Sequence, residues 1–280
     1  MPALARARES ARRASCANNL KQMGLVFKMY ANESKGQKFP TMKWCDYDSA
    51  TPNPNCECNK AANFGLDLFP NMIAVYPEYL SDSNILICPS DPEGTKVEEG
   101  QWLCEGTGAF APAKTGNISY IYYGWAMKGE YMVANPGDIN YTGDFNDVID
   151  PDTLVAILGL AADVQGIWAD PATFSSAADG DVNVPNTGTA RFTIYRLREG
   201  IERFFITDIN NPAGSAQAQS ELAVMHDDVN ANIQQGGGSF NHVPGGGNVL
   251  YMDGHVEFVK YPGEWPICAM WSNVMANLSY

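Results

Sequence analysis

The sequence has 280 residues, of which 45% are hydrophobic and 11% aromatic, and its formal net charge is −14. This composition is that of a globular chain with a packed core, so it excludes a wholly disordered protein. The first thirteen residues hold four arginines and one glutamate, a balance of +3, which leaves −17 on the rest. An acidic body argues against nucleic-acid binding, because phosphates attract Lys and Arg.

The first segment, residues 2–32, is predicted to form one long helix, because it is rich in good helix formers and has no proline after Pro2. In its second half, apolar side chains recur every three or four residues and therefore share one face: Cys16, Leu20, Met23, Phe27 and Tyr30. The first half has no such face and carries four arginines instead: Arg6, Arg8, Arg12 and Arg13. We expect the second half to pack on a core and the first half to project from it.

The elements predicted after this helix are short. Residues 41–63 are expected to form a cysteine- and asparagine-rich loop, 66–80 a short helix interrupted by prolines, and 85–88 an apolar, strand-like run. Strand composition marks residues 118–125, and residues 152–168 predict a buried helix.

The C-terminal half is predicted to be mostly strands. These cover residues 191–196, 205–209 and 222–225, with a turn or short helix at 199–205. Residues 248–261 predict a β-hairpin with Asp253-Gly254 in a type I′ turn. One helix followed by loops and strands indicates an α+β fold, in which a long N-terminal helix packs on an antiparallel sheet with large loop insertions. The expected division is a helix over residues 1–34 and a loop-rich globular head over 35–280.

Four segments carry a resemblance to a known family. Residues 7–30 (ARESARRASCANNLKQMGLVFKMY), 87–92 (ICPSDP), 205–228 and 240–262 resemble prepilin-type proteins with a DUF1559 domain, of the type found in planctomycetes and verrucomicrobia. The last segment is similar to the family's H-X9-DG motif through His242, Asp253 and Gly254. Ten residues separate this histidine from Asp253, one more than the motif's name specifies.

The resemblance implies a structural function. Such proteins are subunits of type IV pilus-like or type II secretion pseudopilus-like filaments. It also implies an apolar helical segment before Met1, a leader that a prepilin peptidase removes, and a precursor anchored in the inner membrane. The mature protein would then lie in the periplasm or on the cell surface, with copies of itself or other pilins as partners. No enzymatic activity is expected.

Within this interpretation, Arg6, Arg8, Arg12 and Arg13 are candidate assembly contacts with acidic surfaces of neighbouring subunits; a solvated helix face is the alternative. Seven cysteines occur without C-x-x-C spacing, which favours disulfides in an oxidising compartment over redox motifs or zinc ribbons. A disulfide between Cys16 and Cys88 is predicted, because both lie in apolar surroundings; two buried free thiols are the alternative.

Two metal hypotheses arise from the C-terminal region. Asp227, Asp228 and Asp253, with loop carbonyls, are a candidate calcium site, because calcium prefers carboxylate and carbonyl oxygens and related pseudopilins hold calcium in a C-terminal loop. A metal-dependent hydrolase is a weaker alternative, and it requires three imidazoles around one metal: His226, His242 and His255.

A third hypothesis is a membrane-anchored, extracytoplasmic module that binds a solute or glycan. Aromatic side chains that could line its pocket are spread over several predicted loops and strands: Trp44, Tyr47, Trp102, Tyr122, Tyr123 and Trp125. The same residues are equally suited to a packed core.

Overall fold

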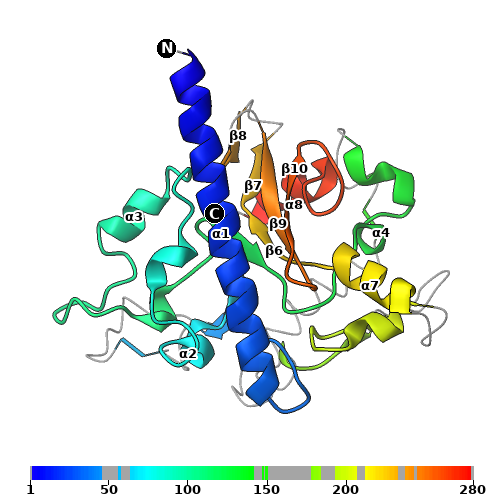
Figure 1. The fold of residues 1–280 in the computed structure, drawn as a ribbon, viewed down its shortest axis with the longest axis horizontal. Helices are drawn as coiled ribbons and strands as arrows, with labels where there is room; N and C mark the ends of the chain where they lie inside the picture. The colour runs from blue at the N-terminus through cyan, green and yellow to red at the C-terminus, as the bar shows by residue number, and fades with distance from the viewer. Residues whose placement is uncertain are drawn as a thin grey trace.

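A computed structural model describes ten segments of the chain: residues 2–45, 56–57, 64–141, 147, 149–150, 178–183, 193–206, 212–232, 237–242 and 245–278. The helix predicted over 152–168 lies outside them. Helix α1, Pro2–Glu33, is continuous over its 32 residues, as its composition predicts. Its first turns extend beyond the rest of the protein, and its second half crosses the head (Figure 1).

The central sheet has four antiparallel strands in the order β10-β9-β6-β3. Their bounds are Tyr120–Tyr122 for β3, Ala223–Asp227 for β6, Gly246–Tyr251 for β9 and Val256–Lys260 for β10. Strands β9 and β10 form the predicted hairpin. Its turn differs from type I′: Gly254 has a positive φ of 92°, but Asp253 does not, and the Gly254 amide donates to the Tyr251 carbonyl over 2.9 Å.

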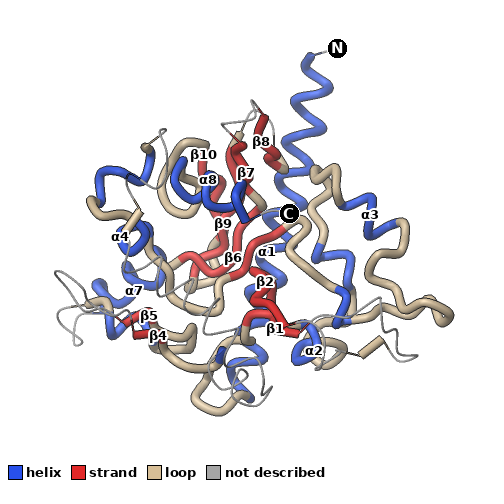
Figure 2. The backbone as a smooth tube through the Cα atoms, turned by 180° about the vertical axis from the view of Figure 1, so that it is seen from behind, coloured by secondary structure: helices blue, strands red, loops and turns tan. Residues whose placement is uncertain are grey.

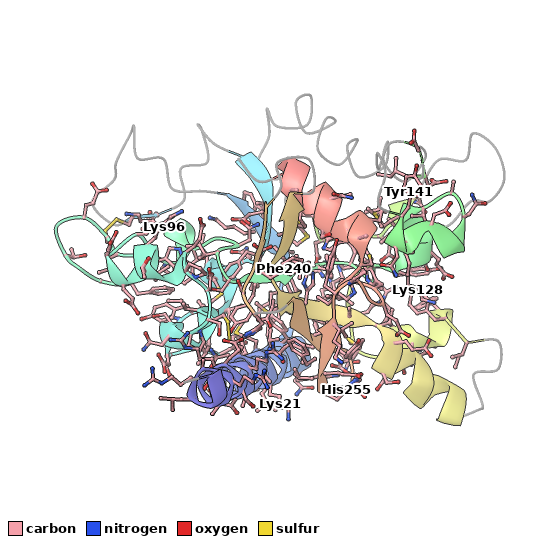
Figure 3. All side chains as sticks on the ribbon, turned by 90° about the horizontal axis from the view of Figure 1, so that it is seen from above. Lys21, Lys96, Lys128, Tyr141, Phe240 and His255 are labelled. Atoms are coloured by element: carbon pink, nitrogen blue, oxygen red, sulfur yellow. A yellow bond between two sulfur atoms is a disulfide. The ribbon has the colours of Figure 1, made fainter. Side chains whose placement is uncertain are left out.

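The sheet lies between two helices. Helix α1 packs on β9, β10 and β6, and helix α8, Ala269–Leu278, lies on the other side of these strands (Figure 3). Helix α8 packs against β7, Val229–Asn232, which pairs with β8, Gly237–Phe240. Strands β6 and β9 are therefore covered on both faces, and every residue of both is buried. Neither α8 nor the β7–β8 hairpin is among the predicted elements.

Short elements surround this centre (Figure 2). Two further antiparallel pairs are β1 with β2 and β4 with β5. The bounds of the remaining elements are β1 Met42–Cys45, β2 Phe64–Pro70, α2 Met72–Val75, η1 Ser83–Leu86, α3 Gly94–Glu98, η2 Pro112–Lys114, α4 Gly129–Met132, η3 Pro136–Asn140, β4 Val182–Asn183, β5 Thr193–Ile194, η5 Ile201–Phe204 and α7 Pro212–Glu221.

Two predicted elements are partly wrong in type. The first residues of the helix predicted over 66–80 form strand β2 instead, because they pair with β1, whereas helix α2 does lie within the predicted range. The strand-like run at 85–88 begins as the 3₁₀ helix η1, because the Asp82 side chain caps it by accepting a hydrogen bond from the Asn84 amide over 3.0 Å. Residues 199–205 do contain a short helix, and residues 222–225 do lie in a strand, as predicted.

The predicted fold class is confirmed: a long N-terminal helix packs on an antiparallel sheet. One continuous apolar core includes side chains from both, among them Phe27 of α1, Ile121 of β3 and Leu250 of β9. In the part of the chain that the structure describes, no helix is both long and apolar enough to cross a membrane.

Candidate functional site

Helix α1 divides at Cys16. From there on, one stripe of its side chains is fully buried, and it is the predicted one except that Tyr30 is half-buried: Cys16, Leu20, Met23 and Phe27. Before Cys16, the side chains of Arg6, Arg8 and Arg12 are exposed. No hydrogen bond or ion pair joins these three arginines to the described residues of the head. The projecting half of the helix therefore exists as predicted.

Arg13 differs from the other three arginines, because it is half-buried at the boundary. Its Nε lies 3.4 Å from Oε1 of Glu9, one turn earlier, and its guanidinium lies 4.3 Å from the centre of the Phe258 ring. Arg13 thus holds α1 to strand β10, whereas Arg6, Arg8 and Arg12 face solvent.

The boundary is fixed by a disulfide between Cys16 and Cys88, whose Cα atoms are 5.3 Å apart. The predicted pairing is confirmed. A second contact reinforces it: the Asn19 amide donates to the carbonyl of Ile87 over 3.0 Å. A third lies two turns earlier, where the Ser90 hydroxyl donates to Glu9 over 3.2 Å. The segment 87–92 is therefore attached to α1 at three levels.

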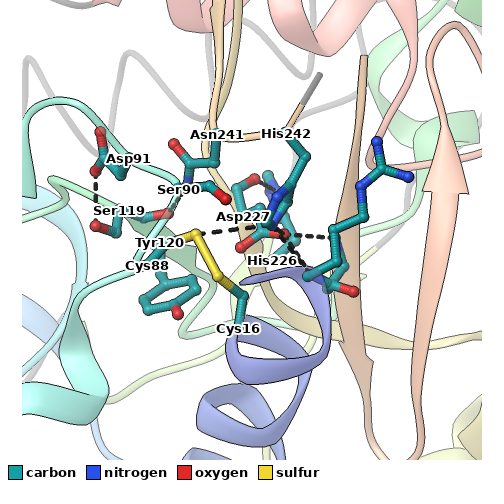
Figure 4. A network of polar contacts seen from close by, with 12 residues as sticks. Cys16, Cys88, Ser90, Asp91, Ser119, Tyr120, His226, Asp227, Asn241 and His242 are labelled. Atoms are coloured by element: carbon teal, nitrogen blue, oxygen red, sulfur yellow. Dashed lines mark hydrogen bonds and ion pairs between the residues drawn. A yellow bond between two sulfur atoms is a disulfide. The ribbon is translucent and has the colours of Figure 1, made fainter. Parts of the chain in front are cut away.

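His242 joins the same place from the C-terminal region (Figure 4). Its Nδ1 lies 2.9 Å from Oε1 of Glu9, and its Nε2 lies 3.1 Å from Oδ2 of Asp227 and 3.6 Å from Sγ of Cys88. Burial alone would lower the pKa of His242, but its contacts with the carboxylates of Asp227 and Glu9 outweigh burial and raise it. The imidazole is therefore held between two carboxylates, one from α1 and one from β6.

Asp227 is fully buried at the end of β6. Its Oδ2 accepts hydrogen bonds from the backbone amide of Asn248 over 2.7 Å and from its side-chain amide over 2.8 Å. Its Oδ1 is buried and has no hydrogen-bond partner among the described residues. A buried carboxylate oxygen without a hydrogen bond costs free energy, because the group would be better solvated in water. The contacts around Asp227 therefore keep its side chain buried.

At this junction, helix α1 therefore meets residues from the early part of the head sequence and residues from its C-terminal region. We use "junction cluster" for its six residues: Glu9, Cys16, Cys88, Asp227, His242 and Asn248. All four segments that carry the family resemblance contribute to it directly: residues 7–30, 87–92, 205–228 and 240–262.

The second buried histidine, His226, lies in a different environment. Its Nε2 is 2.6 Å from the Tyr123 hydroxyl and its Nδ1 is 2.6 Å from the carbonyl oxygen of Asp227. Neither partner is charged at neutral pH, and burial lowers the pKa of His226 to about 4. His226 is thus a neutral, hydrogen-bonded core residue.

The three carboxylates of the predicted calcium site do not meet. Asp227 lies at one end of β6, and Asp253 lies in the β9–β10 turn, beside the other end of that strand. About five residues of extended strand separate the two positions, or roughly 16 Å. Asp228 is half-buried, and burial together with the charge of Asp91 raises its pKa to about 7. The calcium prediction is therefore wrong for these residues as one ligand set.

The histidines also fail to converge on one metal. His255 is stacked on Tyr251 in the hairpin turn, and its Nδ1 lies 2.6 Å from Oδ1 of Asp253. Neither His226 nor His255 belongs to a metal-compatible group among the described residues. The three-histidine hydrolase site lacks the geometry that it requires.

The two halves of the H-X9-DG-like motif lie at opposite ends of strand β9. His242 precedes the strand at the junction, and Asp253-Gly254 forms the turn that follows it. Gly246, at the start of β9, has a φ of +133°, and a Cβ there would clash with the Val259 carbonyl and the Phe258 ring. The glycines at this end let β9 approach β10 closely.

Four of the aromatic residues considered for a ligand pocket are core residues. Trp102, Tyr122, Tyr123 and Trp125 are at most 5% exposed. The first three rings pack on other rings, as Tyr122 does on Phe27 with 4.9 Å between centroids, and the indole N–H of Trp125 donates to the Gly180 carbonyl over 2.8 Å. Trp44 is half-buried, and Tyr47 lies outside the described residues. These side chains therefore support packing rather than an aromatic binding pocket.

The sequence interpretation missed Glu9, Asn19 and Asn248. Glu9 carried a signal, because it is the single acidic residue in the first 32 and lies seven positions before Cys16, two helical turns along the same face. The two asparagines carried none, because their partners are distant in sequence.

Comparison with known proteins agrees with part of the resemblance. The sequence model of the family described as "Protein of unknown function (DUF1559)" matches residues 5–150. The chain belongs to this family. No curated protein and no solved structure matches the chain.

Proposed function

We propose that this protein is a structural subunit of a pilus-like or pseudopilus-like filament, and that the exposed first half of α1 is its assembly surface. The observation that carries this proposal is the continuation of α1 as a regular helix beyond its last buried residue, where Arg6, Arg8 and Arg12 have no ion-pair partner among the described residues. An exposed helix of this length gains little from the head, so a partner is its natural source of stabilisation.

Charge favours a second copy as that partner. The first thirteen residues carry +3 and the rest of the chain −17, so the helix of one subunit attracts the body of the next. Repeating this contact joins subunits head to tail. The series of subunits extends into a filament when the rotation between neighbouring subunits does not close it into a ring.

The junction cluster supports the same function mechanically. A filament transmits force from one subunit to the next through its helices, so the helix must not slide out of its head. The disulfide, the Asn19 amide and the Glu9–His242 contact hold α1 at three levels.

The proposed location is extracytoplasmic. Two disulfides, Cys16–Cys88 and Cys56–Cys104, support it, because structural disulfides persist in oxidising compartments. The inner membrane and a prepilin peptidase are the further partners that this proposal implies.

Electron microscopy of surface filaments from producing cells, with mass spectrometry of their subunits, tests the proposal. A triple charge reversal, Arg6→Glu, Arg8→Glu and Arg12→Glu, is expected to abolish filaments while the purified head keeps its thermal stability. The matched control reverses three exposed lysines elsewhere: Lys21→Glu, Lys35→Glu and Lys260→Glu.

Salt gives an independent measurement. Filament yield is expected to fall above about 0.5 M salt, where screening shortens electrostatic contacts to a few ångströms. Filaments that lack this protein, or a triple variant that assembles like the wild type, would contradict the proposal.

A further inference from the structure

The junction cluster contains four side chains whose chemistry goes beyond holding a helix. Cys16, Cys88, His242 and Asp227 are all buried, and one ligand atom from each lies within 4.8 Å of the others. We propose that, when the Cys16–Cys88 bond is reduced, these four side chains bind one Zn²⁺ ion. The inference is independent of filament assembly.

The donor set is suited to zinc. Cysteine thiolates and histidine imidazoles are the commonest ligands of tetrahedral zinc, and a carboxylate oxygen can be the fourth ligand. Four protein ligands without an open position define a structural site rather than a catalytic one. The carboxylate also disfavours Cu(I), which prefers sulfur.

The distances already match such a site. With Zn–S near 2.3 Å and Zn–N or Zn–O near 2.05 Å, tetrahedral ligands are separated by about 3.6 Å for sulfur and nitrogen and about 3.3 Å for nitrogen and oxygen. Cys88 Sγ lies 3.6 Å from His242 Nε2, which lies 3.1 Å from Asp227 Oδ2. The sulfur of Cys16 also lies within 4.8 Å of the other three ligand atoms.

The surrounding residues support the ligands as they do in known zinc sites. Metal-bound histidines usually donate their other ring N–H to a carboxylate, which fixes the ring and its tautomer. Glu9 occupies this place, with Oε1 2.9 Å from His242 Nδ1. Asn248 holds the carboxylate of Asp227 through two hydrogen bonds. The unpartnered Oδ1 of Asp227 is a second acceptor that a bound cation would satisfy.

The cysteines stay close without their bond. Leu20 and Met23 of α1 are fully buried in the shared core, and Asn19 donates to the carbonyl of Ile87, next to Cys88. Reduction therefore frees the two sulfurs without releasing the segments that carry them.

The chemistry balances in two steps. A phosphine gives two electrons to the disulfide and becomes a phosphine oxide, while water supplies its oxygen and the protons of the two thiols. Zn²⁺ then displaces both thiol protons and any proton on His242 Nε2, with no change in oxidation state. A newly made chain already has thiols and needs no reductant, so zinc and the disulfide are alternative clamps at one place.

The first test uses the full chain, reduced with a phosphine without oxygen and then given Zn²⁺. Other cysteines can also bind zinc, so the background variant replaces Cys45, Cys56, Cys58 and Cys104 by serine and keeps Cys16, Cys88 and the buried Cys268. Native mass spectrometry of the background variant is expected to find one zinc per reduced chain and none per oxidised chain.

Cobalt reports the ligands directly. Co²⁺ in the reduced chain is expected to give the absorption of a tetrahedral site with two thiolates. In His242→Gln the zinc affinity is expected to fall at least about 100-fold, and in Glu9→Gln about 10–100-fold, as for outer-shell partners elsewhere. The matched control His255→Gln changes an exposed histidine and should leave the affinity unchanged.

Two results would overturn the proposal. One is a reduced, folded chain that binds no zinc. The other is zinc binding that survives both His242→Gln and Cys16→Ser. If a variant fails to fold, alkylation of the reduced wild type decides: zinc should slow the labelling of Cys16 and Cys88, but not that of Cys56 and Cys104, and the reverse pattern contradicts the site.

Discussion

The two halves of α1 share one unbroken backbone but differ in what stabilises them. The half after Cys16 buries a stripe of apolar side chains in the core, whereas the half before it exposes arginines on an alanine-rich helix. Packing thus maintains one half, whereas the other depends on helix propensity and on the contacts that Glu9 and Arg13 make near the boundary. One continuous helix therefore has two roles: it is an anchor in the head after Cys16 and an exposed contact surface before it, and the disulfide marks the boundary.

The largest expected effect comes from removing a buried ring of the anchor. Phe27→Ala should destabilise the protein by about 3–5 kcal/mol, because it leaves a cavity against Phe39 and Tyr122. Leu25→Ala is the control on the same helix, since Leu25 is 66% exposed, and it should change stability by less than about 0.5 kcal/mol. Urea unfolding of both variants measures the contrast, and equal losses would contradict the division.

The disulfide at the boundary should matter nearly as much. Replacing Cys16 and Cys88 by serine is expected to cost about 4 kcal/mol, from loop entropy. The second disulfide, Cys56–Cys104, is a close control, because the two bonds span 72 and 48 residues and their loop terms differ by only about 0.4 kcal/mol. If the Cys16–Cys88 variant loses much more stability than the Cys56–Cys104 variant, the excess measures local packing at the boundary. If it loses less, the anchor holds without its disulfide.

Acid should loosen the anchor through the sheet beneath it. His226 has a pKa of about 4 in the folded protein, because it is buried, against 6.5 in the unfolded chain. Between pH 4 and 6.5 the unfolded chain binds more protons than the folded protein. The contribution of neutral His226 to stability is therefore complete above about pH 6.5 and is lost as the pH falls toward 4. The loss is roughly 3 kcal/mol at most. Urea midpoints between about pH 7 and 5 should fall in the wild type and in His255→Gln, but less in His226→Gln.

The smallest effect is expected at the boundary itself. Glu9→Gln removes the charge that faces His242 and should cost about 1 kcal/mol, the net value of one hydrogen bond. Amide exchange should accelerate between Arg6 and Arg13 and stay unchanged beyond Leu20. Glu98→Gln, at an exposed position of α3, is the control. Faster exchange throughout α1 would mean that its two halves unfold together.

The sequence allowed local features to be predicted. The spacing of Cys16, Leu20 and Met23 identified the buried face of α1, and Asp253-Gly254 identified the β9–β10 hairpin, because both patterns depend on neighbours in the chain. The Cys16–Cys88 pairing followed from burial on both sides.

Distant contacts were not predictable in the same way. Strand β3 pairs with β6, so Tyr120 lies opposite Asp227, more than a hundred residues later. The contact of Glu9 with His242 spans 233 residues and leaves no local periodicity. Proximity in sequence also misled: Asp227 and Asp253 are close in the chain, but the length of β6 and β9 separates them.

The bond between Cys16 and Cys88 also determines how the protein responds to proteolysis. A single backbone cut anywhere between the two cysteines leaves both fragments covalently attached, and the shared core keeps them together. A cut before Cys16 is different, because the residues before Cys16 include no cysteine and the released piece has no covalent link to the head. Trypsin-like proteases cleave after arginine, and Arg6, Arg8 and Arg12 all lie on that side. The basic turns are therefore the one part of α1 that a protease can remove while the head stays whole.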